Sequence, residues 1–221
     1  MRFKHFVAIS AIMASGAFTT AAHAEAGDNF IRLRGIVVSP TESSSGITPA
    51  FPAEHVAVND SVMPEIDFTH MVSNNVGFEL IAATTKHNVS GTSGTTGGIG
   101  NLASTWVLPP TLTMQYHFAP EGKVRPYVGA GVNYTVFYSE KATPGLVGAV
   151  GPTTVSMTDS FGWAAQAGVD VDIGENVFLN LDVKYIDIDT TATLSTTAAG
   201  VQTVRAKIDP LVFGAGIGFK F

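Results

Sequence analysis

The stretch Leu211-Val212-Phe213-Gly214-Ala215-Gly216-Ile217-Gly218-Phe219-Lys220-Phe221 stands at the end of the 221-residue sequence and decides the fold class. Large apolar side chains fall at positions 211, 213, 217, 219 and 221, with Ala215 keeping the phase, while glycine, valine and lysine fill the alternate places. This period of two predicts a β-strand. About eleven tilted strand residues cross the core of a bilayer, and the glycines on the other face suit a crowded interior. The stretch fits the closing strand of a transmembrane β-barrel, with the last strand of a soluble β-sandwich as the alternative.

The two aromatic residues at the end of this strand have a predicted role of their own. Outer-membrane barrels carry a terminal phenylalanine as a sorting signal, and Phe219 and Phe221 stand where that signal is expected. We therefore expect the barrel-assembly machinery to be a partner of the chain through Phe221.

The beginning of the chain predicts export. Arg2 and Lys4 precede an apolar run over residues 6–18, and Ala22-His23-Ala24 places small residues just before Glu25. A positive start, a short apolar run and small residues before the cut are typical of a secretory signal peptide. We expect residues 1–24 to be that signal peptide, and residues 25–221 to be one barrel domain in the bacterial outer membrane.

Composition agrees with this class of protein. Hydrophobic residues make up 45% of the chain and charged residues only 14%, which suits a barrel that turns apolar side chains to lipid. The formal net charge of −6 excludes nucleic acid as a partner, because no basic patch is available to neutralise phosphates. The chain has no cysteine, which excludes disulfides and thiolate chemistry.

Seven earlier segments alternate in the same way and predict the other strands: 29–39, 64–72, 76–87, 105–118, 125–139, 160–173 and 177–185. Ser/Thr/Gly-rich loops alternate along the chain with short turns, and outward aromatic residues near the strand ends predict two interfacial girdles. Long outer loops, short periplasmic turns and an even strand number are the layout of outer-membrane barrels. A soluble lipocalin-type barrel would turn its apolar face inward, where this chain has charges. We predict an all-β fold, an eight-stranded antiparallel transmembrane β-barrel.

The inward positions change character along the barrel. Toward the long-loop end they are apolar and predict a hydrophobic pocket formed by Ile36, Val38, Val107, Phe137 and Ile186. Lower down they predict a polar plug formed by Arg32, Arg34, Glu65, Asp67, Glu79, Asp170, Asp182 and Lys184. Arg32 and Arg34 on the first strand neighbour acidic residues on the second, so we expect opposite charges to pair inside. Eight strands leave room only for side chains or one small ligand, and charges that merely fill and rigidify the barrel are the alternative.

Pro109-Pro110 lies within the upper part of the fourth predicted strand. Two successive residues without N–H donors interrupt a β-ladder. Because a charged plug is costly for an apolar molecule to pass, we predict that ligand leaves through the wall here, at a lateral gate. A bulge with no role in transport is the alternative interpretation.

Catalysis and metal binding find no support in the sequence. The histidines are spread over separate strands, no Gly-x-Ser-x-Gly turn is present, and no His and carboxylate residues show metal-ligand spacing. We expect neither an enzyme nor a metal site, and no cofactor.

Several longer runs resemble the outer membrane protein W (OmpW) family, which includes alkane-uptake porins. They are residues 83–87 (ATTKH), 104–118 (STWVLPPTLTMQYHF), 125–135 (RPYVGAGVNYT), 161–163 (FGW), 166–170 (QAGVD), 182–189 (DVKYIDID) and 208–210 (IDP). The resemblance implies an eight-stranded barrel whose narrow hydrophobic channel passes small hydrophobic compounds, so the implied partners are outer-membrane lipids and small hydrophobic ligands. A structural or receptor barrel that acts through its extracellular loops is the alternative function.

Overall fold

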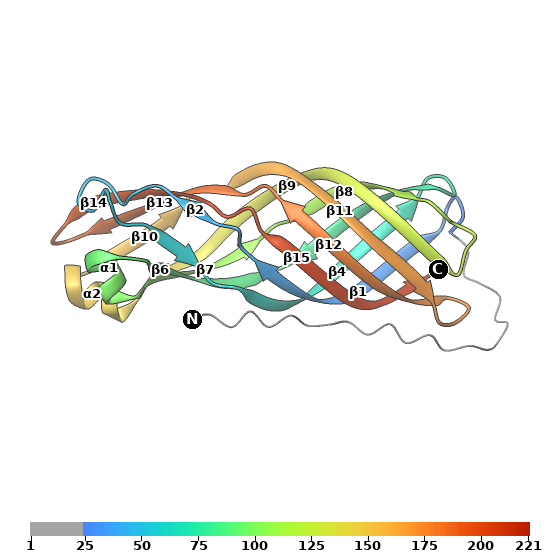
Figure 1. The fold of residues 1–221 in the computed structure, drawn as a ribbon, viewed down its shortest axis with the longest axis horizontal. Helices are drawn as coiled ribbons and strands as arrows, with labels where there is room; N and C mark the ends of the chain where they lie inside the picture. The colour runs from blue at the N-terminus through green and yellow to red at the C-terminus, as the bar shows by residue number, and fades with distance from the viewer. Residues whose placement is uncertain (1–23) are drawn as a thin grey trace.

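The computed structural model describes residues 24–221, so the predicted signal peptide lies outside the described residues apart from Ala24. Within residues 24–221, eight antiparallel strands close into one barrel, because each pairs with the next and the last pairs with the first (Figure 1). In order around the wall they are β1 (Asn29–Ser39), β4 (Ser61–Met71), β5 (Val76–Ala83), β8 (Thr111–His117), β9 (Val124–Ala142), β11 (Ser160–Asp172), β12 (Val177–Ile186) and β15 (Leu211–Lys220). The predicted eight-stranded antiparallel barrel is confirmed.

The closing strand β15 lies between β1 and β12, in a register that runs from Phe30↔Lys220 to Ser39↔Leu211 on the β1 side. Phe213, Ile217 and Phe219 face outward, whereas Val212 faces inward, and the glycines face a crowded interior as predicted. At Gly218 the reason is direct, since a Cβ atom there would overlap the ring of Phe178. The glycine therefore makes room for an aromatic side chain of the neighbouring strand.

The long segments at one end of the barrel are ordered, and the prediction of plain loops there was wrong. They form a head at the left of Figure 1, at the end of the barrel away from the C-terminus. Its elements are β2 (Ser43–Ser44), β3 (Val56–Val58), β6 (Thr85–Gly91), α1 (Gly94–Ile99), β7 (Asn101–Leu108), α2 (Pro144–Val150), β10 (Thr153–Met157), β13 (Asp189–Thr196) and β14 (Gly200–Lys207). Threonine explains the error in β13 and β14, because this β-branched residue favours strands although it is polar.

Two of the predicted strands are interrupted. The third ends as β5 at Ala83 and resumes as β6 at Thr85, and the fourth ends as β7 at Leu108 and resumes as β8 at Thr111. The second interruption coincides with Pro109-Pro110, which lack the N–H groups that a ladder needs.

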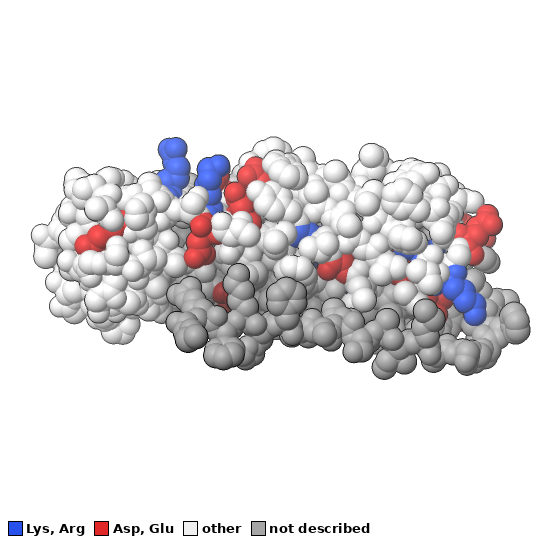
Figure 2. Space-filling model, in the orientation of Figure 1, with Lys and Arg blue, Asp and Glu red and all other residues white. Residues whose placement is uncertain are grey.

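The outer wall of the barrel is apolar. Each of the eight barrel strands exposes at least one leucine, isoleucine, valine or phenylalanine side chain. Outward-facing aromatic pairs, each with at least one exposed ring, lie near the strand ends: Trp106 with Tyr138 and Trp163 with Tyr185 toward the head, and Tyr116 with Phe118 toward the C-terminal end. Figure 2 shows charged side chains gathered where the head meets the barrel and at the opposite end, while the visible wall between them is mostly white. Neither helix among residues 24–221 is long and apolar enough to cross a membrane.

Candidate functional site

The upper half of the lumen holds an apolar cavity. All five residues of the predicted pocket are buried and line it: Ile36, Val38, Val107, Phe137 and Ile186. The cavity contains about 920 Å³ of space not filled by atoms, part of it open to solvent. A concave, mostly apolar lining with few polar groups is typical of small-molecule sites. The geometry that the alternation predicted for this pocket is therefore present, and its role in binding stays a prediction.

The sequence interpretation missed the part of the cavity wall that the head contributes. Inward residues of the head and of the segments that join it to the barrel complete the lining: Val56, Val58, Val89, Ile188, Ala192, Val204, Ala206 and Ile208. The signal was present, because small or apolar residues recur at every second position over 186–192 and 204–208. It was overlooked because those segments were interpreted as loops.

A second apolar chamber lies within the head. It contains about 600 Å³ of unfilled space and is lined by residues that include Ile47, Phe51, Leu102 and Leu146. The two chambers share five lining residues, namely Val56, Val89, Met157, Ala192 and Val204. Apolar lining therefore continues from the head into the barrel lumen.

Below the cavity, Arg34 organises a buried charged layer. Its guanidinium lies 2.7 Å from both Asp67 and Asp182 and 2.9 Å from Glu65, and Nη1 also donates to Asn180 at 3.0 Å. The contacts of Nε and Nη2 are ion pairs without hydrogen-bond geometry. The predicted pairing of the first strand with Glu65 and Asp67 is therefore confirmed for Arg34.

Arg32 pairs differently from the prediction. Its guanidinium lies 2.9 Å from Glu79 and 2.8 Å from Asp170 across the lumen, rather than against Glu65 or Asp67. Asp67 is already paired with Arg34, and the long Arg32 side chain crosses the narrow lumen to reach Asp170 on β11. The predicted pairing with the second strand is therefore wrong for Arg32, whose partners lie on β5 and β11, two strands that are not adjacent to β1.

Lys184 joins the cavity floor to this layer. Its Nζ lies 2.6 Å from Glu65, which lines the cavity, and 3.1 Å from Asp182. All eight residues of the predicted plug are buried and belong to one network of ion pairs. Three of the eight are basic residues and five are acidic residues. The described residues include no group of three or more His, Asp or Glu side chains placed to hold a metal ion.

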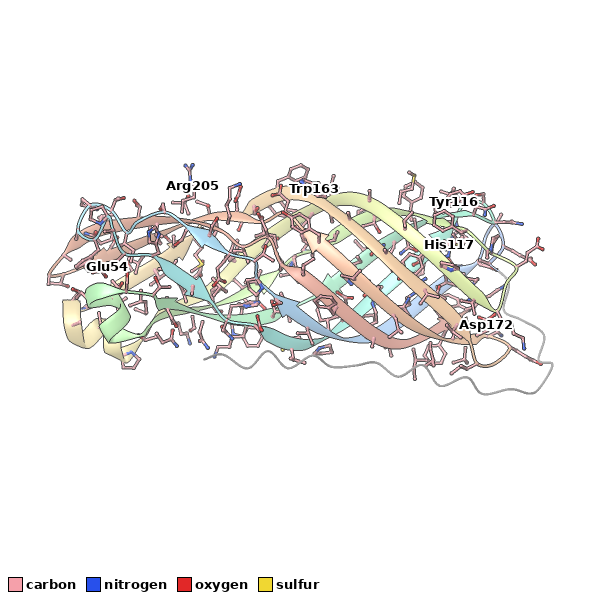
Figure 3. The ribbon with its side chains drawn as sticks, in the orientation of Figure 1. Glu54, Tyr116, His117, Trp163, Asp172 and Arg205 are labelled. Carbon is pink, nitrogen blue, oxygen red and sulfur yellow. The ribbon has the colours of Figure 1, made fainter. Side chains whose placement is uncertain are left out.

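An aromatic layer that the sequence interpretation did not single out lies beneath the charges. The Arg32 guanidinium is 5.4 to 5.6 Å from the ring centres of Phe30, Tyr127 and Phe178, the last two at the same distance. His117, labelled near the right end of Figure 3, lies 5.2 Å from the Tyr127 ring. These side chains are at most 1% exposed, so the lower lumen is filled. Cations held over ring faces in this way gain about 0.5–2 kcal/mol each.

The predicted lateral gate coincides with a gap in the pairing of the wall. On one side, β9 continues past the break and pairs with both Leu108 and Thr111. On the other side, pairing stops at Ile81↔Thr111 and resumes at Thr85↔Val107. Residues 82–84 therefore face residues 108–110 without ladder pairs, and we call this gap the lateral slot. Ala83 and Pro109 both line the cavity, so the slot borders it.

Phe219 and Phe221 are exposed near the end of the barrel opposite the head. The backbone of Phe221 exchanges two hydrogen bonds with Asn29, which fixes the last residue against the first strand. Their role as a sorting signal, and their recognition by the assembly machinery, stay predictions.

A closed antiparallel barrel with an apolar outer wall, aromatic girdles and a charged, filled lower lumen defines an outer-membrane β-barrel protein. The OmpW family model matches residues 25–221, and the chain belongs to this family. It is 37% identical over 216 residues to outer membrane protein W of Escherichia coli, covering 97% of this chain and 96% of that protein. The bacterial outer membrane is accordingly its location.

Solved structures agree with the fold. The crystal structure of OprG from Pseudomonas aeruginosa superimposes with a TM-score of 0.85 at 31% identity, covering 91% of this chain and 99% of that one. The solid-state NMR structure of AlkL in lipid bilayers superimposes with a TM-score of 0.68 at 21% identity, covering 95% and 97%. The AlkL likeness supports the barrel fold alone.

Proposed function

We propose that this protein takes small neutral apolar molecules into its upper cavity and passes them sideways into the outer membrane. The observation that carries the proposal is that the apolar lining ends on a buried charged layer. An apolar molecule moving further down would have to separate ion pairs such as Arg34 with Asp182, which lie 2.7 Å apart. Leaving a buried charge without its partner is strongly unfavourable.

The lateral slot supplies a sideways path. It is bordered by small side chains, Ala82, Ala83 and Thr84 on one edge and two prolines on the other. The inner side of the slot meets the cavity, and its outer side meets the exposed side chains Leu80, Leu108 and Leu112. A molecule that leaves here exchanges one apolar environment for another and passes no charge.

The lining of the cavity supports a preference for neutral molecules. It is mostly apolar, and Glu65 at its floor is already paired with Arg34 at 2.9 Å and with Lys184 at 2.6 Å. A carboxylate on the ligand would lose its hydration among these side chains, which opposes its binding. We therefore assign neutral apolar molecules, and not their anionic analogues, to this site.

The test is transfer of an environment-sensitive neutral apolar probe into vesicles that contain the reconstituted protein, beside an anionic analogue of similar size. We expect the protein to accelerate only the neutral probe. In the double variant Pro109→Val, Pro110→Val, two N–H donors are restored and the slot can pair, so transfer should fall to near the protein-free rate. Pro126→Val is the matched control, since this exposed proline lies in β9 away from the slot.

A structural or receptor barrel predicts a different result. Strands that continue beyond the barrel into the head fit such a protein, but a lumen that is apolar in its upper half does not. If the neutral probe enters no faster with the protein than without it, the transport proposal is wrong, and a receptor or structural function of the head is favoured. If the double variant transfers at the wild-type rate, the sideways route is wrong while transport stands.

A further inference from the structure

A hydrogen bond crosses the outside of the lateral slot. The hydroxyls of Thr84 and Tyr138 lie 2.6 Å apart. Thr84 is in the break between β5 and β6, whereas Tyr138 is in β9, and β7 lies between them in the sheet. The tyrosine side chain therefore reaches over β7 to the far edge of the slot.

The Tyr138 ring is held in this direction by its neighbour. Trp106, the residue opposite Tyr138 on β7, stacks on it with ring centres 6.4 Å apart and an angle of 25° between the planes. In the girdle near the head, Tyr138 is exposed and Trp106 is half-buried. A ring supported in this way presents its hydroxyl to Thr84 with little loss of side-chain entropy.

The proline edge of the slot is held separately, from inside the barrel. The Asn133 side-chain amide on β9 donates toward the carbonyls of Pro109 at 3.2 Å and Pro110 at 3.3 Å, and to the Thr111 hydroxyl at 2.8 Å. Its own carbonyl accepts from Thr135 at 2.6 Å. Asn133 is 1% exposed, so these bonds are shielded from water. The proline edge is thus bound to β9. On the opposite edge Ala82 and Ala83 pair with β4, and residues 82–84 have no ladder partner on the slot side.

We propose that the Thr84–Tyr138 hydroxyl pair is a tether that limits opening of the lateral slot, and that Asn133 holds the frame against which the slot opens. This inference rests on the proposed lateral exit. When the pair is formed, the edge at Thr84 is joined to β9 across β7, and the slot stays narrow. When it breaks, no ladder bond opposes outward movement of residues 82–84 on that side.

The tether predicts that removing either hydroxyl speeds transfer of the neutral probe. Tyr138→Phe and Thr84→Val each keep the shape of the side chain and lose the hydrogen bond. Breaking one such bond changes an equilibrium by about two- to tenfold, so we expect a rise of that size in the transfer rate of each variant. The double variant should be no faster than either single variant, because both changes remove the same bond.

Tyr134→Phe is the matched control. Tyr134 lies on the same strand, is exposed, and uses its hydroxyl to bond Asp159 at 2.9 Å rather than to cross the slot. Its loss should leave the transfer rate unchanged. If Tyr138→Phe and Thr84→Val transfer at the wild-type rate while the wild-type protein still exceeds protein-free vesicles, the tether is wrong and the transport proposal stands.

A second measurement separates the tether from transport altogether. The chain has no cysteine, so spin labels can be placed at Ala82→Cys and Leu108→Cys on the two edges of the slot. We expect the distribution of label distances to broaden toward longer values when Tyr138→Phe is added, whether or not any probe is carried. An unchanged distribution would overturn the tether even if transfer were altered.

Discussion

The lower and upper halves of the lumen use the same strands for opposite purposes. Along β1 the inward side chains change from Arg32 and Arg34 to Ile36 and Val38, and along β12 they change from Lys184 to Ile186. Below this level the side chains fill the space and bond to one another, and above it they line an apolar cavity. Strand pairing sets the wall in both halves, so the inward residues alone decide whether the barrel is a plug or a pocket.

This difference assigns stability and ligand binding to separate halves. A buried ion network is stable only while every member has its partners, because each charge lost leaves another unpaired at low dielectric. An apolar lining makes no such demand and tolerates changes of shape where space is free. Substitutions below should therefore change folding strongly, and substitutions above should change transfer with little effect on folding.

The strongest test of this division is Arg34→Leu. The change leaves Glu65, Asp67 and Asp182 without their shared cation, and we expect the free energy of unfolding to fall by about 3–5 kcal/mol. Denaturant unfolding of the reconstituted barrel measures it. Lys207→Ala is the control, since its pair with Asp189 is exposed at 3.8 Å and should contribute less than about 1 kcal/mol. Equal effects of the two variants would show that the charged layer does not stabilise the barrel.

The sequence predicted the wall and the division of the lumen, because both follow from alternation. A residue that faces inward on one strand fixes the facing of the whole strand, so the pocket and plug residues followed once the strands were found. Resemblance to the OmpW family agreed with the same positions. For residues 211–221, the alternation of apolar side chains was enough to predict a strand.

The partners across the lumen and the head could not be predicted in the same way. Arg32 bonds Asp170, 138 positions away, and pairing patterns between neighbouring strands do not report which side chains meet across a barrel. In the head, polar β-branched residues hid strands such as β13. The slot tether was missed for a third reason, since the contact of Thr84 with Tyr138 passes over an intervening strand.

Filling the upper cavity should have the opposite effect from Arg34→Leu: transfer should fall while stability changes little. Val212 lines the cavity on β15 and lies opposite Val38. In Val212→Phe the larger side chain enters free space, so we expect the free energy of unfolding to change by less than about 1.5 kcal/mol, while transfer of the neutral probe falls severalfold. Val183→Phe, which adds the same ring to the outer wall, is the control for transfer. Normal transfer by Val212→Phe would show that the cavity is not the path of the ligand.

The smallest expected effect concerns a carboxylate in the head that, unlike those of the lower lumen, is only half-buried. Glu54, at the head end in Figure 3, accepts hydrogen bonds from the Thr96 hydroxyl and from the backbone N–H groups of Thr95 and Thr96 at the start of α1. These hydrogen bonds lower the pKa of Glu54 below its ordinary value, and the bond from the Thr96 hydroxyl has the largest effect. Because the folded-state pKa is lowered, the stabilisation is present at neutral pH and is lost as pH falls through the folded-state pKa.

We therefore expect the amides of Thr95 and Thr96 to lose protection from hydrogen exchange, relative to their intrinsic rates, only in acid below the ordinary range of a glutamate, about pH 4. In Glu54→Gln the charge is absent at every pH, so protection should be weaker at neutral pH and should no longer change with acid. Glu121→Gln, in a turn at the opposite end, should behave as wild type. The barrel itself should unfold at the same denaturant concentration in all three proteins, because the contact lies in the head and not in the charged layer. A loss of barrel stability in Glu54→Gln approaching that of Arg34→Leu would contradict the division between the halves, since a half-buried carboxylate of the head would then stabilise the barrel as much as the buried charged layer does.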